Sequence, residues 1–84
     1  MGKITPAFSQ ALADVLRRRR EAKGMSLAKL AELAGLTQTY PGRLEKKERV
    51  PTVDVAHALA RALDCELSEL VRDAEKRMRR KGRQ

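Results

Sequence analysis

The chain has few of the residues from which small proteins build catalytic centres, metal sites or disulfide frameworks. Its 84 residues include one cysteine and one histidine. Cys65 has no partner for an internal disulfide, so we expect a reduced, buried thiol. His57 has no second histidine, cysteine or suitably spaced carboxylate pair to complete a metal site or catalytic triad. Because nucleophile–base pairs and phosphate-binding loops are also missing, we predict a protein that is not an enzyme and needs no metal or cofactor.

Long apolar runs are absent as well. No run approaches the roughly 20 residues that span a bilayer, and the N-terminus lacks the charged-then-apolar order of a signal peptide. We therefore expect a soluble, unprocessed, cytoplasmic protein without a membrane partner. The length allows one domain, which we place at residues 1–78, followed by a basic tail at residues 79–84.

Positive charge is what the chain has in excess. Lysine and arginine number 19 against 11 aspartate and glutamate residues, which gives a formal net charge of +8. Such a chain attracts nucleic acid, since neutralised phosphates release counterions. One tyrosine, one phenylalanine and no tryptophan offer few platforms for unstacked bases. The composition therefore favours duplex DNA over single strands or RNA loops.

Apolar residues recur at helical spacing along most of the chain. Gly24 and Gly35 are suited to left-handed C-caps, and Ser26 and Thr37 to N-caps. Two short helices joined by a turn with glycine predict a helix-turn-helix over about residues 26–46. The predicted helices cover about residues 6–23, 26–35, 37–46 and 51–64, and a fifth, extended C-terminal helix begins near residue 67, in a compact all-α bundle of five helices.

The last predicted helix carries a long apolar stripe. Leu67 and Leu70 can complete the core, whereas Val71, Ala74 and Met78 extend the stripe beyond the length that the other four helices can cover. An apolar strip left over on so small a domain usually has a partner. We therefore predict that these five residues form a homodimer interface.

The stretch from Leu16 to Leu70 resembles the Cro and phage-repressor (XRE) family of helix-turn-helix proteins. The order and spacing of several short pieces carry the resemblance. These are Arg20 four residues before Gly24, Ser26, Leu30-Ala31, Gly35-Leu36-Thr37, Tyr40, Leu44-Glu45, Pro51-Thr52 and Ala60-Arg61-Ala62-Leu63. The resemblance implies a five-helix DNA-binding domain, usually dimeric, that reads the major groove with the helix after Gly35.

The resemblance assigns base reading to Gln38 and Thr39 at the start of that helix and to Arg43 one turn later. Glutamine can bond adenine, arginine can bond guanine, and a threonine methyl can pack on thymine. A solvated helix face is the alternative interpretation of these three residues.

Phosphate contacts are expected around the same helix pair. The resemblance places one at the N-terminus of the second helix, where free amides and the helix dipole attract an anion. It also pairs Arg20 with Glu45, and the arginine can face phosphate as well. The basic residues after the third helix stand where backbone phosphates should pass. The full predicted set is Arg20, Ser26, Leu27, Tyr40, Lys46, Lys47 and Arg49.

Three departures from the family pattern bear on this site. Pro41-Gly42 stands where the family has a branched apolar residue and a polar one, and as the fourth helical residue the proline would remove the first helical hydrogen bond. Leu27 replaces a glutamine that contacts phosphate. Lys47 replaces the usual glycine after the helix, so a different cap is expected there.

The sequence thus predicts a transcriptional regulator that binds an inverted-repeat operator as a homodimer, with no small-molecule effector implied. A phage-like repressor, a controller of a restriction system and an antitoxin with a toxin partner remain open. The second class of function is a protein-interaction module that uses the basic face and the C-terminal helix. RNA binding is a further alternative.

Overall fold

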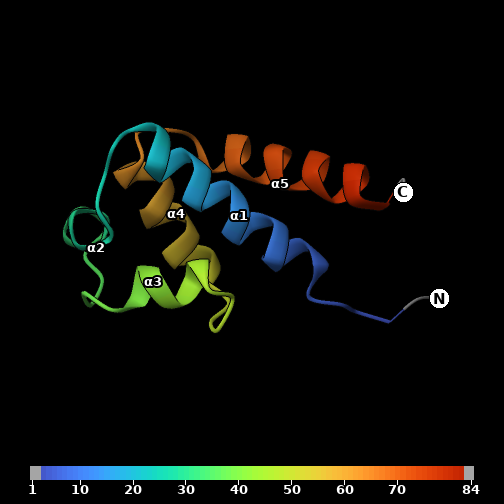
Figure 1. The fold of residues 1–84 in the computed structure, drawn as a ribbon, viewed down its shortest axis with the longest axis horizontal. Helices are drawn as coiled ribbons and strands as arrows, with labels where there is room; N and C mark the ends of the chain where they lie inside the picture. Colours follow the sequence, from blue (N-terminus) through green and yellow to red (C-terminus); the bar gives the residue numbers. More distant parts are fainter. Residues whose placement is uncertain (1–2, 83–84) are drawn as a thin grey trace.

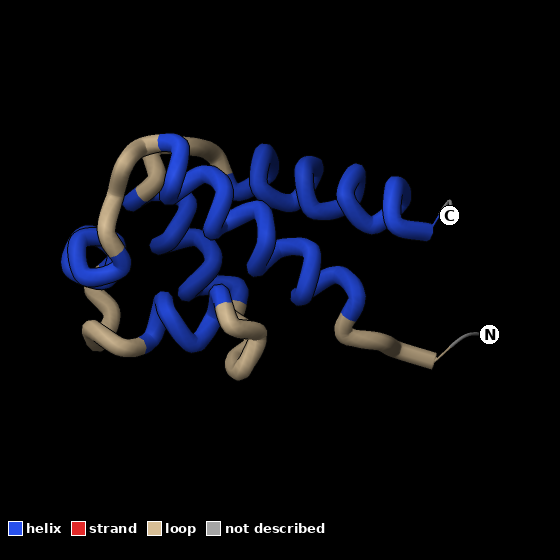
Figure 2. The backbone as a smooth tube through the Cα atoms, in the orientation of Figure 1, coloured by secondary structure: helices blue, strands red, loops and turns tan. Residues whose placement is uncertain are grey.

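The computed structural model describes residues 3–82, with side chains through residue 80. It contains five helices, α1 (Ala7–Ala22), α2 (Leu27–Ala34), α3 (Tyr40–Glu45), α4 (Val53–Ala62) and α5 (Leu67–Gly82) (Figure 1). Short loops join them, and residues 3–82 include no strand (Figure 2). The predicted all-α fold of five helices is confirmed. Within the same residues, no helix combines the length and apolar character needed to cross a membrane.

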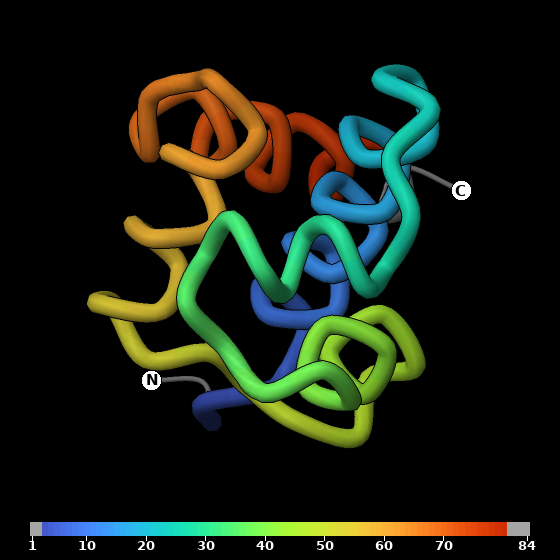
Figure 3. Tube along the Cα trace, turned by 90° about the vertical axis from the view of Figure 1, so that its left-hand side faces the viewer, coloured from blue at the N-terminus to red at the C-terminus, as the bar shows by residue number. Residues whose placement is uncertain are grey.

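Helix α1 lies at the centre of the fold. α5 packs along one flank of it and α3 lies on another, so that both views place α1 between them (Figures 1 and 3). Burying one large apolar side chain stabilises a fold by about 1.5–3 kcal/mol. The largest fully buried side chains are Leu30, Pro41, Leu44, Leu59, Leu63 and Leu70. Cys65 is a half-buried free thiol beside this core, and burial raises its pKa.

Helix α5 is the extended C-terminal helix that the sequence predicts, but the covering of its apolar stripe differs from the prediction. It runs to Gly82, so most of the predicted basic tail is helical, while Arg83 and Gln84 lie outside the described residues. Residues 79–81 are all good helix formers, which accounts for the extension. Leu70 and Ala74 are both 0 % exposed, because α1 runs alongside α5. The expectation that these two residues face a second copy is therefore wrong.

Side-chain hydroxyls cap two of the helices, whereas α1 begins without a side-chain cap. Ser26 accepts a hydrogen bond from the N–H three residues on at 3.0 Å, and Thr52 does the same at 3.1 Å. In α1, Pro6 rather than Thr5 is the N-cap, and the Thr5 hydroxyl accepts from the Ala7 N–H at 3.4 Å. Hydroxyl caps thus position the starts of α2 and α4.

The first four helices end in the same C-terminal motif. Gly24, Gly35, Lys47 and Asp64 each adopt a left-handed conformation, with φ of 64°, 73°, 67° and 62°. The N–H of the residue after each donates to the carbonyl five residues earlier, at 2.9–3.1 Å. Asp64 thus substitutes for a glycine. The expectation of a different cap at Lys47 is wrong, because the lysine takes the left-handed conformation itself.

Asp64→Gly is expected to stabilise the fold by about 1 kcal/mol, or about 4–8 °C in melting temperature. Glycine removes the steric cost of the left-handed backbone and takes a negative charge from the C-terminus of α4. Asp64→Asn is the matched control, because it removes only the charge, and it should give a smaller rise. A thermal melt in which Asp64→Gly is no more stable than the parent would contradict the strain argument.

Candidate nucleic-acid interface

Helix α3 begins later than the sequence predicts. Tyr40 is its first residue, and Thr39 rather than Thr37 is the N-cap, with no side-chain hydrogen bond. The Tyr40 N–H donates to the Thr37 carbonyl at 3.1 Å, which closes a tight turn. Pro41 has no N–H, so it cannot donate the next hydrogen bond, from residue 41 to the same carbonyl. Gln38 and Thr39 therefore form the turn before α3 instead of its first residues.

The Pro41-Gly42 pair fits the start of α3 without breaking it. Pro41 is the second helical residue, where a backbone N–H has no helical acceptor in any case. Its ring is fully buried beside Leu16 and Leu30, in the core. A Cβ added to Gly42 would lie 3.7 Å from the Leu27 side chain, an ordinary contact. The expected loss of a helical hydrogen bond does not occur, because the helix starts later.

Arg20 of α1 and Glu45 at the end of α3 form the predicted ion pair. The Arg20 Nε and Nη2 donate to the two Glu45 oxygens at 2.6 and 2.9 Å, and Nη1 donates to the Met25 carbonyl at 2.7 Å. The two side chains are only 13 % and 9 % exposed. The hydrogen bond to Glu45 raises the pKa of Arg20. This two-point contact holds α3 against α1.

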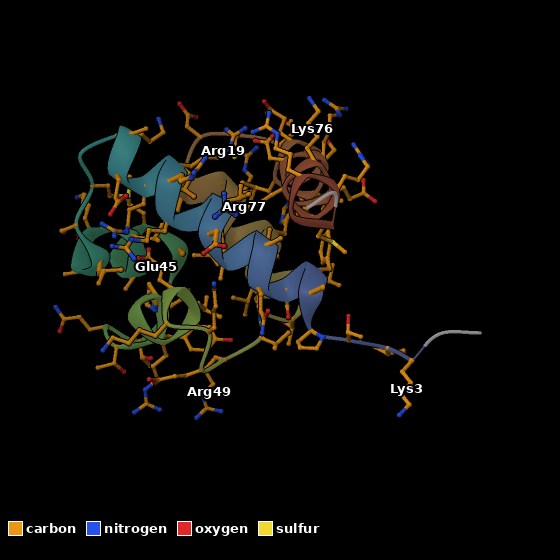
Figure 4. The ribbon with its side chains drawn as sticks, turned by 45° about the vertical axis from the view of Figure 1, so that its right-hand side comes forward. Lys3, Arg19, Glu45, Arg49, Lys76 and Arg77 are labelled. Atoms are coloured by element: carbon orange, nitrogen blue, oxygen red, sulfur yellow. The ribbon has the colours of Figure 1, made fainter. Side chains whose placement is uncertain are left out.

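Since all three of its guanidinium nitrogens are engaged within the fold, we assign Arg20 to the scaffold. The predicted phosphate contact by Arg20 is therefore unsupported. Glu45 lies where α3 faces α1 (Figure 4).

The N-terminus of α2 lies beside α3. The Ser26 hydroxyl accepts from the Lys29 N–H, while the amides of Leu27 and Ala28 have no acceptor within the helix. The nearness of Leu27 to Gly42 places this helix end against the side of α3. An anion bound here would meet both free amides and the positive end of the helix dipole.

The three predicted base readers share one exposed segment. Gln38 and Thr39 lie in the turn, and Arg43 lies on α3 one turn after Thr39. All three side chains are exposed, and Arg43 pairs with no carboxylate among the described residues. Tyr40 is half-buried against the core. The segment can therefore offer an amide, a hydroxyl and a guanidinium to one ligand.

Three exposed cations follow α3. Lys46 and Arg49 pair with no carboxylate in the described part of the chain, and Arg49 lies at the edge of the molecule farthest from α5 in Figure 4. Lys47 instead places its Nζ 3.2 Å from an oxygen of Asp14. Of these three predicted phosphate-binding cations, Lys46 and Arg49 are thus the two without an ion pair in the described part of the chain.

Asp14 was not singled out from the sequence as a link between elements. Its carboxylate contacts Lys47 after α3 and Arg77 of α5, the latter at 3.0 Å. Partial burial acts to raise the pKa of Asp14, but hydrogen bonds from Arg77 and Lys47 outweigh it and hold the pKa below its usual value. Asp14 therefore ties the loop after α3 and helix α5 to α1.

Lys29 is a further cation that the sequence reasoning missed. It is exposed in the first turn of α2, where its Nζ lies 3.4 Å from Glu32. The signal was its position three residues after the Ser26 cap, beside the free amides of the helix end.

Comparisons with known proteins point to one family. A helix-turn-helix family model matches residues 16–70. The control protein C.SmaI of Serratia marcescens is 37 % identical over 64 residues, which are 76 % of this chain and 76 % of that protein. The solved structure of the restriction-modification controller protein C.AhdI from Aeromonas hydrophila aligns with a TM-score of 0.71 and 39 % identity, over 74 % of this chain and 94 % of that one.

A third comparison concerns the fold alone. The clp gene regulator ClgR from Corynebacterium glutamicum aligns with a TM-score of 0.84 at 24 % identity, over 89 % of this chain and 80 % of that one. The arrangement of the five helices is thus shared by regulators of different sequence.

Proposed function

Because the chain belongs to the XRE-type helix-turn-helix family of DNA-binding transcriptional regulators, we propose that it acts as a homodimer on an inverted-repeat operator in duplex DNA. The observation that supports this most is the exposed segment of Gln38, Thr39 and Arg43. It comprises the turn before α3 and one residue of α3, and a buried ion pair holds that helix to the core. In the proposal these three residues contact base edges in the major groove.

Phosphates flank the base readers in this proposal. The free amides at the N-terminus of α2 and the Ser26 hydroxyl proton bind one phosphate, beside the Leu27 side chain. Lys46 and Arg49 bind phosphates beyond α3, and Tyr40 and Lys47 line the same path. Contacts of this kind fix the register of a protein on DNA and carry no sequence information directly.

Among regulators of this family, we place the chain with the controllers of restriction-modification systems. The relative at 37 % identity is named a control protein, and the structure at 39 % identity is named a restriction-modification controller protein. This favours a controller over a phage-like repressor or a toxin-binding antitoxin. The operator should then lie upstream of restriction or methylation genes in the source genome.

Selection of bound duplexes from a random pool, at stated salt, tests the proposed function. We expect a palindromic consensus with half-sites one helical turn apart, about 34–36 Å between centres. A pool without enrichment would overturn the proposal and favour a protein-interaction module instead.

The proposed dimer follows from the size of the reading surface. One recognition segment contacts few base pairs, so a single copy discriminates poorly among genomic sites. With Leu70 and Ala74 in the core, the remaining apolar candidates on α5 are Leu67, Val71 and Met78, all half-buried and spaced to share one side of the helix. We propose that this side of α5 meets its counterpart across a two-fold axis.

Val71→Glu should dissociate the dimer, because a charge buried without a partner costs several kcal/mol. Sedimentation equilibrium at tens of micromolar should show a dimeric parent and a mainly monomeric variant. Ser68→Glu adds the same charge at an exposed position of α5 and should stay dimeric. A monomeric parent, or a Val71→Glu variant that remains dimeric, would show that the interface lies elsewhere.

A further inference from the structure

A basic groove runs between α1 and α5. Its volume is about 190 Å³. In Figure 4, Arg19 and Lys76 lie near one another at the α5 side of the molecule, with Arg77 between the two helices. The residues that line it are Val15, Arg18 and Arg19 of α1 and Asp73, Lys76, Arg77 and Arg80 of α5.

Cations in the groove outnumber the carboxylates that could balance them. Arg19 donates to Asp73 at 2.9 Å, and Arg77 donates to Asp14 beside the groove at 3.0 Å. The other three cations, Arg18, Lys76 and Arg80, are exposed and pair with no carboxylate among the described residues. An anion in the groove would relieve this uncompensated charge.

The groove is separate from both surfaces of the proposed function. α1 lies between α5 and α3, so the groove and α3 are on different flanks of α1 (Figures 1 and 3). Asp73, Lys76, Arg77 and Arg80 recur at helical spacing on one side of α5, whereas Val71 and the half-buried apolar residues in register with it occupy another. Pairing two copies through the groove would also oppose like charges.

The chemistry of the groove favours a nucleic-acid backbone over an acidic protein. Protein interfaces need apolar anchors at their centre, whereas protein–DNA interfaces are polar and positively charged. The one apolar lining residue, Val15, is only 6 % exposed. The large exposed apolar side chains lie outside the groove, namely Ile4, Leu27, Leu33, Val50 and Val53.

The groove also has the length of a short run of phosphates. Lys76 and Arg80 are one turn apart on α5, and the lining residues from Asp73 to Arg80 span about 10 Å of the helix axis. Along the axis of a duplex, where each strand carries one phosphate about every 3.4 Å, this length corresponds to about three nucleotide steps. Arginine side chains bind phosphate oxygens through paired N–H groups.

We propose that this α1–α5 groove is a second nucleic-acid site, which binds the phosphodiester backbone of another duplex segment without sequence preference while α3 occupies the operator. The regulator then holds two segments of DNA together, either two molecules or the operator and its own flanking DNA.

Capture of a second duplex tests the proposal. Full-length protein is bound to an immobilised operator duplex, and retention of a fluorescent random-sequence duplex is measured across a salt series. The groove variant carries Arg18→Gln, Lys76→Gln and Arg80→Gln, none of which removes a described ion pair. The matched control carries Arg17→Gln, Lys23→Gln and Arg61→Gln, three exposed cations outside the groove.

The parent and the control should retain the second duplex, and the groove variant should retain about tenfold less and lose about two to three units of salt slope. Operator binding by all three proteins shows that they are folded. Failure of the parent to retain a second duplex would overturn the proposal. So would equal losses in both variants, or displacement of the duplex by polyglutamate more readily than by polyphosphate.

This test remains separable from the proposed function. If no operator is found, the affinity of the groove variant for a random duplex can still be compared with that of the control variant. This comparison tests the groove directly. A groove variant that binds random duplex as tightly as the control would then count against the second site, whatever α3 does.

Discussion

Glu45→Ala is expected to lower the free energy of unfolding by about 3–5 kcal/mol, as the breaking of a buried ion pair does. The substitution leaves the Arg20 guanidinium, 13 % exposed, with the Met25 carbonyl at 2.7 Å and, at 4.0 Å, a carboxylate oxygen of the half-exposed Glu21. Domains of this kind are stable by about 5–15 kcal/mol in total. The melting temperature should therefore fall by more than about 10 °C.

An exposed ion pair on the same molecule supplies the control. Lys29 and Glu32 are 55 % and 71 % exposed, so Glu32→Ala should change stability by no more than about 1 kcal/mol. Arg20→Met combined with Glu45→Leu should recover part of the loss, because it leaves no charge unpaired. Equal melting temperatures for Glu45→Ala and the parent would mean that the pair contributes nothing to stability.

Elements defined by local chemistry could be predicted from the sequence. Ser26 and Thr52 cap helices through their own hydroxyls, and Gly24 and Gly35 take left-handed conformations that glycine adopts without steric cost. These features depend on a few neighbouring residues. The pairing of Arg20 with Glu45 spans 25 residues, and it could be predicted only from the family resemblance.

Features that depend on packing were predicted less well. A cap by the Thr37 hydroxyl would start α3 too early: Pro41 is buried in the core, and α3 begins at Tyr40. The periodicity of the apolar stripe of α5 does not show that α1 runs alongside it and buries Ala74, so the sequence alone leaves the stripe without a cover.

The exposure of the predicted base readers follows the sequence, whereas the contacts of the neighbouring cations could not be predicted from it. Gln38, Thr39 and Arg43 lie together and exposed, as a reading surface requires. Lys47 is a cation in the loop after α3, where a phosphate contact is predicted. Its side chain nevertheless contacts Asp14, a residue 33 positions away along the chain. Charge alone does not show which cations the fold already uses.

Arg43→Ala is expected to weaken binding to the selected operator by about 1–3 kcal/mol, or about 5- to 150-fold, and to relax preference at one base position in each half-site. Arg43 is exposed on α3 and pairs with no carboxylate in the described part of the chain, so its removal disturbs no described ion pair. Binding to random duplex should fall much less, because base contacts add little to affinity without sequence preference.

Lys46→Ala is the matched control. Lys46 directly follows α3, and the substitution removes one exposed positive charge, as Arg43→Ala does. If Lys46 contacts phosphate, the variant should weaken operator and random duplex alike and reduce the salt slope by about one unit. The two variants lose the same charge, so only a base contact separates their effects on sequence preference. If Arg43→Ala and Lys46→Ala lower both affinities in the same ratio, Arg43 binds backbone, and the reading of bases rests on Gln38 and Thr39 alone.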